Sequence, residues 1–248
     1  NKKSQAELKA WNEHVDKESA PSNQEVPSYV QVVGAVYKNS DPSDIAVTAA
    51  GGLVGEVIQV WRPRELNTHE TEWGFSCMSY EISGALGIKM ANPDKEVISF
   101  VGDGSYLLNN TDIYSSVITN NKLIIIVCDN GGFAVINRLQ LFKGGNEYNN
   151  LLKSSNTPGL VDVDFAKHAE SMGAKSEHVN SISDLEEAFK RAKKSDVTYV
   201  ISIKTHAYQW LEGSAFWDSP TLEIPTTKEN KEALKLYKEG KNKQRQGV

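Results

Sequence analysis

Short apolar runs alternate with segments of helical periodicity through most of the chain. The runs at 45–49, 96–101, 122–128, 175–179 and 198–203 have the length and composition of buried strands. Helical patterns occupy 53–61, 75–90, 106–119, 164–172 and 183–193. Alternation of strand and helix is typical of a sheet whose parallel strands are joined by crossover helices. The pattern predicts an α/β fold, with a doubly wound, mainly parallel sheet flanked by helices.

The two ends of the chain differ from this centre. A polar helix is predicted over 4–18 and an amphipathic helix over 29–37, with a proline-bounded break between them. We expect 1–40 to form linker and lead-in helices, 41–225 to form one domain, and 226–248 to form a charged helix and tail. The stretches 131–158 and 206–225 have no clear periodicity, which favours active-site loops.

Charge and hydropathy narrow the classes of function. The net charge is −5 and the lysines are dispersed except in the tail, so no basic field for nucleic acid is expected. The longest strongly apolar run, 123–128, is far shorter than the roughly 20 residues of a membrane helix. A membrane protein is therefore not expected.

The chain begins with neither Met nor an apolar signal region, which predicts a domain cut from a longer polypeptide. The two cysteines, Cys77 and Cys128, lie in apolar surroundings without a CxxC pair. This argues against a disulfide framework or a zinc site, and we expect a reducing cytoplasm.

Glycine-rich turns with acidic or amide side chains follow two of the predicted strands. The sequence Gly-Asp-Gly-Ser at 102–105 leads into a helix, and Asp-Asn-Gly-Gly at 129–132 follows the next strand. Ligands of open α/β sheets bind beyond the carboxyl ends of the strands. A helix N-terminus offers N–H groups to phosphate oxygens, whereas a carboxylate beside a phosphate requires a hard cation such as Mg²⁺ between them.

Asp103 and Asn130 lie 27 positions apart across one predicted β-α-β unit. If the two strands are neighbours, their carboxyl ends meet at one edge, and a single ion reaches both side chains. Each turn by itself is also what Asp and Asn form as a helix cap or tight turn. The pair and its spacing favour metal binding over two capping turns.

This spacing, from Gly102-Asp103-Gly104 to Asp129-Asn130, resembles the fingerprint of thiamine-diphosphate enzymes, in which GDG is followed by a pair usually written NN. The resemblance implies the thiamine-diphosphate-binding fold, with thiamine diphosphate and Mg²⁺ as cofactors. It implies that Asp103, the side chain of Asn130 and the carbonyl of Gly132 bind the metal. Met78 corresponds to the bulky residue that bends the cofactor. The remaining implied cofactor contacts are Gly51, Gly52, Ser76, Gly104, Ser105 and Phe133.

Within this superfamily the chain is similar to the hydrolases that open trihydroxycyclohexane-1,2-dione in myo-inositol breakdown. The matching stretches are 72–82, 102–107, 129–133, 216–218 and 243–245. The resemblance implies cleavage of a ring C–C bond in a cyclic diketone, with addition of water to give a deoxy-glucuronic acid. It also implies a homo-oligomer, and an activating glutamate on a pyrimidine-binding domain of the same or a partner subunit. That domain is not present, so no catalytic residue is assigned here, and we expect the chain alone to be inactive.

The sequence departs from the family pattern at three positions. Asp129 replaces the first Asn of the pair, and Ser79 stands where many relatives have Gly. Ile136 stands where some decarboxylating relatives carry a catalytic Glu, which argues against decarboxylation. Acetolactate-synthase-like or semialdehyde-decarboxylating chemistry remains an alternative with the same cofactor. A non-catalytic phosphate- or nucleotide-binding module is the alternative outside enzymes.

Two further groups of residues each have two interpretations. His69, Glu70 and Glu72 form a polar cluster that is either a substrate or proton-transfer group or a solvated loop. The aromatic residues of 206–217 form either a lid over the cofactor or the footing of a subunit interface.

Overall fold

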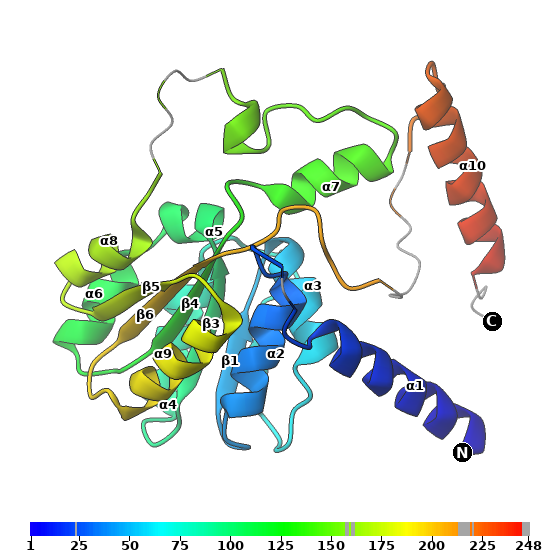
Figure 1. Ribbon diagram of the computed structural model, residues 1–248. Helices are drawn as coiled ribbons and strands as arrows, with labels where there is room; N and C mark the ends of the chain where they lie inside the picture. The colour runs from blue at the N-terminus through cyan, green and yellow to red at the C-terminus, as the bar shows by residue number, and fades with distance from the viewer. Residues whose placement is uncertain (23, 157–158, 160–161, 213–218, 220, 245–248) are drawn as a thin grey trace.

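The computed structural model describes residues 1–22, 24–156, 159, 162–212, 219 and 221–244. At its centre is a 6-stranded sheet in the order β2-β1-β3-β4-β6-β5, and every neighbouring pair in that order runs parallel (Figure 1). The strands are β1 (Ile45–Thr48), β2 (His69–Thr71), β3 (Val97–Gly102), β4 (Ile124–Asp129), β5 (Lys175–Val179) and β6 (Tyr199–Lys204). The predicted doubly wound α/β fold is confirmed.

Helices cover both faces of the sheet. On one face lie α2 (Tyr29–Asn39), α3 (Gly51–Val60) and α9 (Ile182–Lys194). On the other lie α4 (Tyr80–Ala91), α5 (Asp103–Leu108), α6 (Thr111–Ile118) and α8 (Phe165–Ser171). A parallel sheet needs this double cover because each crossover helix packs back onto the strands that it connects.

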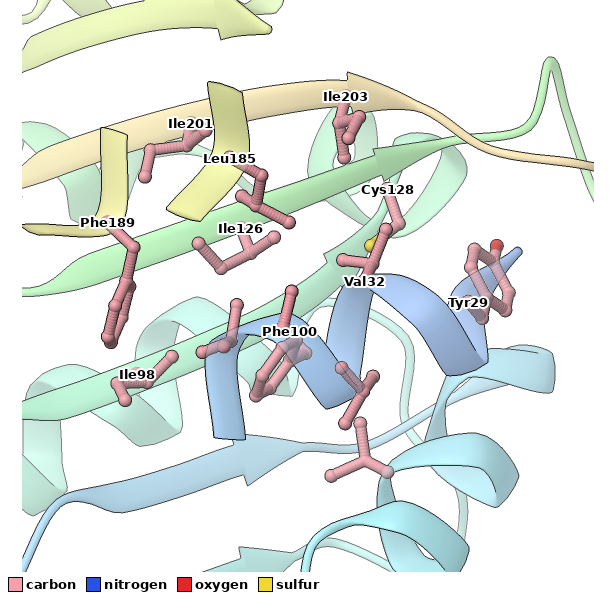
Figure 2. Packing of buried hydrophobic residues seen from close by; sticks show 14 of the residues in the cluster. Tyr29, Val32, Ile98, Phe100, Ile126, Cys128, Leu185, Phe189, Ile201 and Ile203 are labelled. Carbon is pink, nitrogen blue, oxygen red and sulfur yellow. The ribbon is translucent and has the colours of Figure 1, made fainter. Parts of the chain in front are cut away.

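The central strands are apolar on both sides because each faces two layers of helices. In β4, Ile124 and Ile126 pack toward α2 and α9, whereas Ile125 and Val127 pack toward the opposite layer. Figure 2 shows the first of these clusters, with Phe100 and Ile126 of the sheet against Leu185 and other side chains of the covering helices. Every residue of β4 is buried, which explains its continuous run of Ile and Val.

Helix α2 differs from the amphipathic helix that the sequence predicts. All residues from Tyr29 to Val36 are buried, because α2 packs among the sheet, α3, α9 and the end of α1 (Lys2–Glu18). A side chain at Gly34 would have its Cβ 2.5 Å from Cβ of Ser19, so glycine permits this approach. The helix begins with a capping box formed by Ser28 and Gln31.

Three segments differ from the predicted helices. The helix expected over 106–119 is two helices, and at the break Asn110 donates to the carbonyl of Tyr106 over 3.1 Å. The helix expected over 75–90 begins only at Tyr80, because Ser76 and Ser79 have φ values of 51° and 80°. The stretch expected to be a loop at 131–158 contains α7 (Ala134–Phe142) and a 3-10 turn at Leu152–Ser154.

Strand β2 occupies the edge of the sheet in a segment expected to be a polar cluster. At the other end of the chain, α10 (Lys228–Lys243) agrees with the predicted charged helix. Helices α1 and α10 project from the layered body (Figure 1). Among the described residues, no helix is both long and apolar enough to cross a membrane.

Candidate functional site

A cavity of about 210 Å³ lies where the loops after β1, β3 and β4 converge. Its wall combines the start of α3, the loop before α4, the start of α5, the turn before α7, and Tyr29 of α2. All of the predicted metal ligands and cofactor contacts line this one cavity, namely Gly51, Gly52, Ser76, Met78, Asp103, Gly104, Ser105, Asn130, Gly132 and Phe133. Their roles as ligands stay predictions.

Strands β3 and β4 are direct neighbours, as the predicted β-α-β unit requires. Gly102 pairs with Cys128, so the turns that follow the two strands lie side by side at the same edge. The side chain of Asp103 thereby reaches the second turn, where its Oδ2 accepts a hydrogen bond from the N–H of Gly132 over 2.7 Å.

Asp103 has an environment that favours a bound cation. The residue is buried, and its Oδ1 atom has no hydrogen-bond partner. Burial and the negative charge of Asp129 raise the pKa of Asp103 to about 7, against the N–H groups of Gly132, Gly104 and Asn130 that favour the charged form. A cation at Oδ1 would remove this penalty, because opposite charge stabilises the carboxylate.

Asn130 presents a second unsatisfied oxygen to the same cavity. Its Nδ2 donates to the hydroxyl of Tyr29, whereas its Oδ1 is buried without a partner. Buried polar atoms in native proteins almost always have a partner, so two such oxygens in one cavity call for a ligand. A carboxylate oxygen and an amide oxygen are ligands that Mg²⁺ prefers, and the residues present fit that ion. Among the described residues, no group of three or more His, Cys, Asp and Glu side chains is placed to hold a metal ion.

The turn at Gly131 and Gly132 is held tightly against a second loop. The N–H of Phe133 donates to the carbonyl of Asn150, and the N–H of Leu152 donates to the carbonyl of Gly131, each over 2.8 Å. Gly132 has a φ of 142°, and a Cβ there would lie 2.6 Å from the carbonyl oxygen of Asn150. Glycine is therefore required at this predicted ligand by both its backbone conformation and its surroundings.

Glycines also bring the starts of α3 and α5 close to the cavity. Gly51 has a φ of 78°. Gly104 lies against the ring of Phe133, and a Cβ added to Gly104 would lie 2.6 Å from that ring. The first N–H groups of a helix have no partner within it. Two helix starts thus offer N–H donors along one wall, which suits the oxygens of a diphosphate.

Glu81 supports this wall from behind and was not singled out by the sequence. Its buried carboxylate accepts from the N–H of Ala50 over 3.2 Å and from the hydroxyl of Ser105 over 2.8 Å. The same Ser105 hydroxyl accepts from the N–H of Ser79 over 2.6 Å. Burial raises the pKa of Glu81. Because the hydroxyl proton of Ser105 points to Glu81, the backbone N–H of Ser105 is the donor left for a cofactor.

Ser79 holds a left-handed backbone conformation, with a φ of 80°. We expect Ser79→Gly to stabilise the fold by roughly 1 kcal/mol, because glycine adopts this conformation without a clash of Cβ. The variant keeps the hydrogen bond from the backbone N–H of residue 79 to the hydroxyl of Ser105. Urea unfolding measures the difference, with Ser79→Ala as the control that retains Cβ and gains nothing. Equal stability of the two variants would contradict the explanation.

His69, Glu70 and Glu72 are not among the residues that line the cavity. The imidazole of His69 bonds the Thr71 hydroxyl over 3.0 Å, and burial lowers the pKa of His69. Glu72 accepts from the N–H groups of Phe75 and Cys77 over 2.9 and 2.7 Å. Glu72 thereby shapes the loop that carries Ser76 and Met78 to the cavity.

The described part of the aromatic segment, 206–212, ties several helices together. The N–H of His206 donates to the carbonyl of Pro27 over 2.9 Å, and the guanidinium of Arg138 lies 4.1 Å from the centre of the Trp210 ring. The N–H of Leu211 donates to both carboxylate oxygens of buried Glu56 over 3.1 Å. Trp217 lies outside the described residues, so the choice between lid and interface stays a prediction.

Glu56 makes stability depend on pH. Burial raises the pKa of Glu56 from 4.5 to about 7, against the opposing effects of the Leu211 N–H and Arg138. The folded state holds this proton more tightly than the unfolded state, so its stabilising effect is complete below pH 4.5 and is lost as pH rises to about 7. We expect the free energy of unfolding to fall by roughly 3 kcal/mol at most as the pH rises over this interval.

Urea unfolding of the wild type and of Glu56→Gln, at about pH 5 and pH 8, measures this pH dependence. The variant should lose less stability over this interval, and an identical loss would contradict the assignment.

Comparison with known proteins identifies the family of the chain. Residues 49–203 match the family model described as "Thiamine pyrophosphate enzyme, C-terminal TPP binding domain". The chain is 36% identical over 205 residues to 3D-(3,5/4)-trihydroxycyclohexane-1,2-dione hydrolase of Bacillus licheniformis. The aligned residues make up 82% of the chain and 32% of that hydrolase. Proteins of the same name from Bacillus subtilis and Lacticaseibacillus casei are 34% and 37% identical, over 79% and 84% of the chain and 30% and 32% of their own lengths. The chain therefore spans about a third of the length of these relatives.

Two solved structures share the fold. A thiamine diphosphate-dependent 4-hydroxybenzoylformate decarboxylase of Rhodococcus jostii RHA1 superposes with a TM-score of 0.65 at 22% identity, over 77% of the chain and 34% of the decarboxylase. Benzoylformate decarboxylase from Polynucleobacter necessarius superposes with a TM-score of 0.61 at 21% identity, over 71% of the chain and 32% of the decarboxylase. At this identity, the likeness concerns the fold alone.

Proposed function

The chain belongs to the C-terminal, TPP-binding domains of the thiamine pyrophosphate enzymes, and from this premise we propose that its cavity binds the cofactor's diphosphate through one Mg²⁺ ion. The observation that carries the proposal is the pair of buried oxygens, Oδ1 of Asp103 and Oδ1 of Asn130, that lack partners in one cavity. In this proposal both bind the metal, together with the carbonyl of Gly132. One carboxylate with two neutral oxygens leaves room for diphosphate oxygens around the ion.

The rest of the wall orients the cofactor. Gly51 and Gly52 begin α3, and Gly104 and Ser105 lie in the first turn of α5, so their N–H groups are donors for diphosphate oxygens. Half-buried Met78 and the ring of Phe133 add apolar surface to the cavity wall. When bound, thiamine diphosphate supplies a nucleophilic carbon that adds to a carbonyl group and accepts the charge left by C–C cleavage. The residues described here bind and orient it, whereas its activating glutamate is expected on a pyrimidine-binding domain.

For the whole protein, we propose hydrolysis of a C–C bond in trihydroxycyclohexane-1,2-dione, giving 5-deoxy-glucuronic acid. Support comes from the relatives named for hydrolysis of that dione, which are 34–37% identical to this chain. Because the chain spans about a third of their length, the proposed reaction belongs to a longer polypeptide. We expect that polypeptide to be a homo-oligomer in the cytoplasm.

Ile136 favours this reaction over decarboxylation. The half-exposed side chain of Ile136 lines the cavity at the position where some decarboxylating relatives carry a catalytic Glu. An isoleucine neither donates nor accepts a proton, so this position cannot serve acid–base catalysis. The decarboxylases among the solved structures share the fold with this chain at 21–22% identity, which does not carry their reaction over.

Steady-state kinetics of the full-length protein tests the proposed reaction. The dione and pyruvate are each supplied with thiamine diphosphate and Mg²⁺, with protein stripped of both as the control. Ring opening of the dione, dependent on both additions, is the expected result. Conversion of pyruvate without conversion of the dione would overturn the assignment in favour of acetolactate-synthase-like chemistry. Displacement of thiamine diphosphate by equimolar ADP would favour a nucleotide-binding module instead.

A further inference from the structure

Tyr29 enters the cavity from a part of the chain that lies outside the matched family region, 49–203. It is the first residue of α2 and precedes Asn130 by 101 positions. Figure 2 shows its ring at the edge of the apolar cluster, beyond Val32 and Cys128. The residue is 8% exposed, so its ring is packed while its hydroxyl reaches the cavity wall.

The backbone on either side of Tyr29 is fixed by hydrogen bonds. In the capping box, the N–H of Ser28 donates to the side chain of Gln31 over 3.0 Å. The same Gln31 amide donates to the carbonyl of Ala20 over 2.9 Å, and Pro27 accepts from the N–H of His206 over 2.9 Å. These contacts join the chain before α2 to α2 itself and to the segment after β6. The position of the tyrosine ring is therefore set by the fold, independently of a ligand.

The hydroxyl of Tyr29 accepts a hydrogen bond from Nδ2 of Asn130. The two ends of an amide differ, because the nitrogen donates and the oxygen accepts. With the nitrogen held on Tyr29, Oδ1 is the end that remains buried in the cavity without a partner. The opposite rotamer would direct an NH₂ group at the metal, where it offers no lone pair.

We propose that Tyr29 is a positioning residue that holds the Asn130 amide with its oxygen toward the metal of the cofactor site. The inference rests on the proposed function, since it takes Asn130 as a metal ligand. It assigns to α2, which precedes the matched family region, a direct part in setting metal affinity. Groups that orient metal ligands from behind commonly change metal affinity about 10- to 100-fold.

The test is Mn²⁺ binding to the full-length protein in the presence of thiamine diphosphate, followed by the electron paramagnetic resonance signal of free Mn²⁺. Tyr29→Phe keeps the packed ring and removes the hydroxyl. We expect Mn²⁺ affinity to fall at least about tenfold. Tyr106→Phe is the matched control, because its buried hydroxyl bonds His168 over 2.9 Å on the other side of the sheet. That variant should keep the wild-type affinity.

Asn130→Ala and the double variant Tyr29→Phe/Asn130→Ala complete a double-mutant cycle. If Tyr29 acts through Asn130, the double variant binds Mn²⁺ no more weakly than Asn130→Ala. Unchanged affinity in Tyr29→Phe, or fully additive losses in the double variant, would overturn the inference while leaving the proposed function intact. Equal Mn²⁺ binding by the wild type and Asp103→Asn would instead refute the metal site itself. Circular dichroism of each variant distinguishes lost metal affinity from lost folding.

Discussion

Asp103→Asn is expected to lower the affinity for thiamine diphosphate in Mg²⁺ by at least about 100-fold, because loss of a direct ligand costs more than the 10- to 100-fold typical of a supporting group. The substitution keeps the size of the side chain and removes its negative charge. It also keeps an oxygen that can accept the hydrogen bond from the N–H of Gly132, which Oδ2 of Asp103 accepts over 2.7 Å in the wild type. Isothermal titration calorimetry of the full-length protein measures the change.

Asp129→Asn is the matched control, one residue before Asn130. Asp129 forms an ion pair with Lys204 at 2.6 Å, and its negative charge raises the pKa of Asp103. Removing that charge lowers the pKa of Asp103 and leaves its carboxylate in place, so Mg²⁺-dependent binding should be retained. An equal loss in both variants would mean that general charge near the turn, rather than ligation by Asp103, governs cofactor binding.

Gly132→Ala is the second substitution expected to have a large effect, with destabilisation of about 3 kcal/mol from backbone strain and overpacking together. At a φ of 142°, the new Cβ would lie 2.6 Å from the backbone carbonyl oxygen of Asn150 and 3.1 Å from Cα of Leu151. The turn cannot yield without breaking its hydrogen bonds to this loop. Urea unfolding measures the loss, and Mg²⁺-dependent binding should weaken as the turn shifts.

Gly131→Ala separates backbone strain from crowding. Gly131 also has a positive φ, 77°, but a Cβ there meets nothing within 4 Å. Only the left-handed conformation is penalised, at a cost of roughly 1 to 2 kcal/mol. Equal destabilisation by the two substitutions would contradict the role given to the contact between Gly132 and Asn150.

Much of the sheet is readable from the sequence because its central strands are buried on both faces. The runs that became β3, β4 and β6 are rich in Val and Ile, and no helical period fits them. The turns at Asp103 and Asn130 are readable for the same reason, since each follows one of these strands directly. Their spacing places them on one β-α-β unit, and the register of β3 with β4 then brings them together.

The structure alone reveals the residues that support those turns. Tyr29 contacts Asn130 across 101 positions of sequence, and Glu81 contacts Ser105 across 24. Neither contact has a periodic or spacing signal. Glu81 was visible as a charged residue in a helix otherwise rich in small and apolar side chains, and this mismatch marks it for a buried role.

Helix α7 was missed because its start is determined by tertiary contacts. Phe133 precedes it without a side-chain cap, and the turn before it contains two glycines with positive φ. Hydrogen bonds from the loop at Asn150 and Leu152 hold that turn in place. Such distant contacts override the local preference of a Gly- and Asn-rich stretch for irregular structure.

The most direct test of the central claim is ³¹P NMR of thiamine diphosphate bound to the full-length protein, with Mn²⁺ replacing Mg²⁺. If the metal at Asp103 and Asn130 bridges to the diphosphate, Mn²⁺ broadens both phosphorus resonances of the cofactor that is bound to the wild-type protein. Sharp phosphorus resonances from bound cofactor in Mn²⁺-loaded wild-type protein would contradict the metal-bridged site.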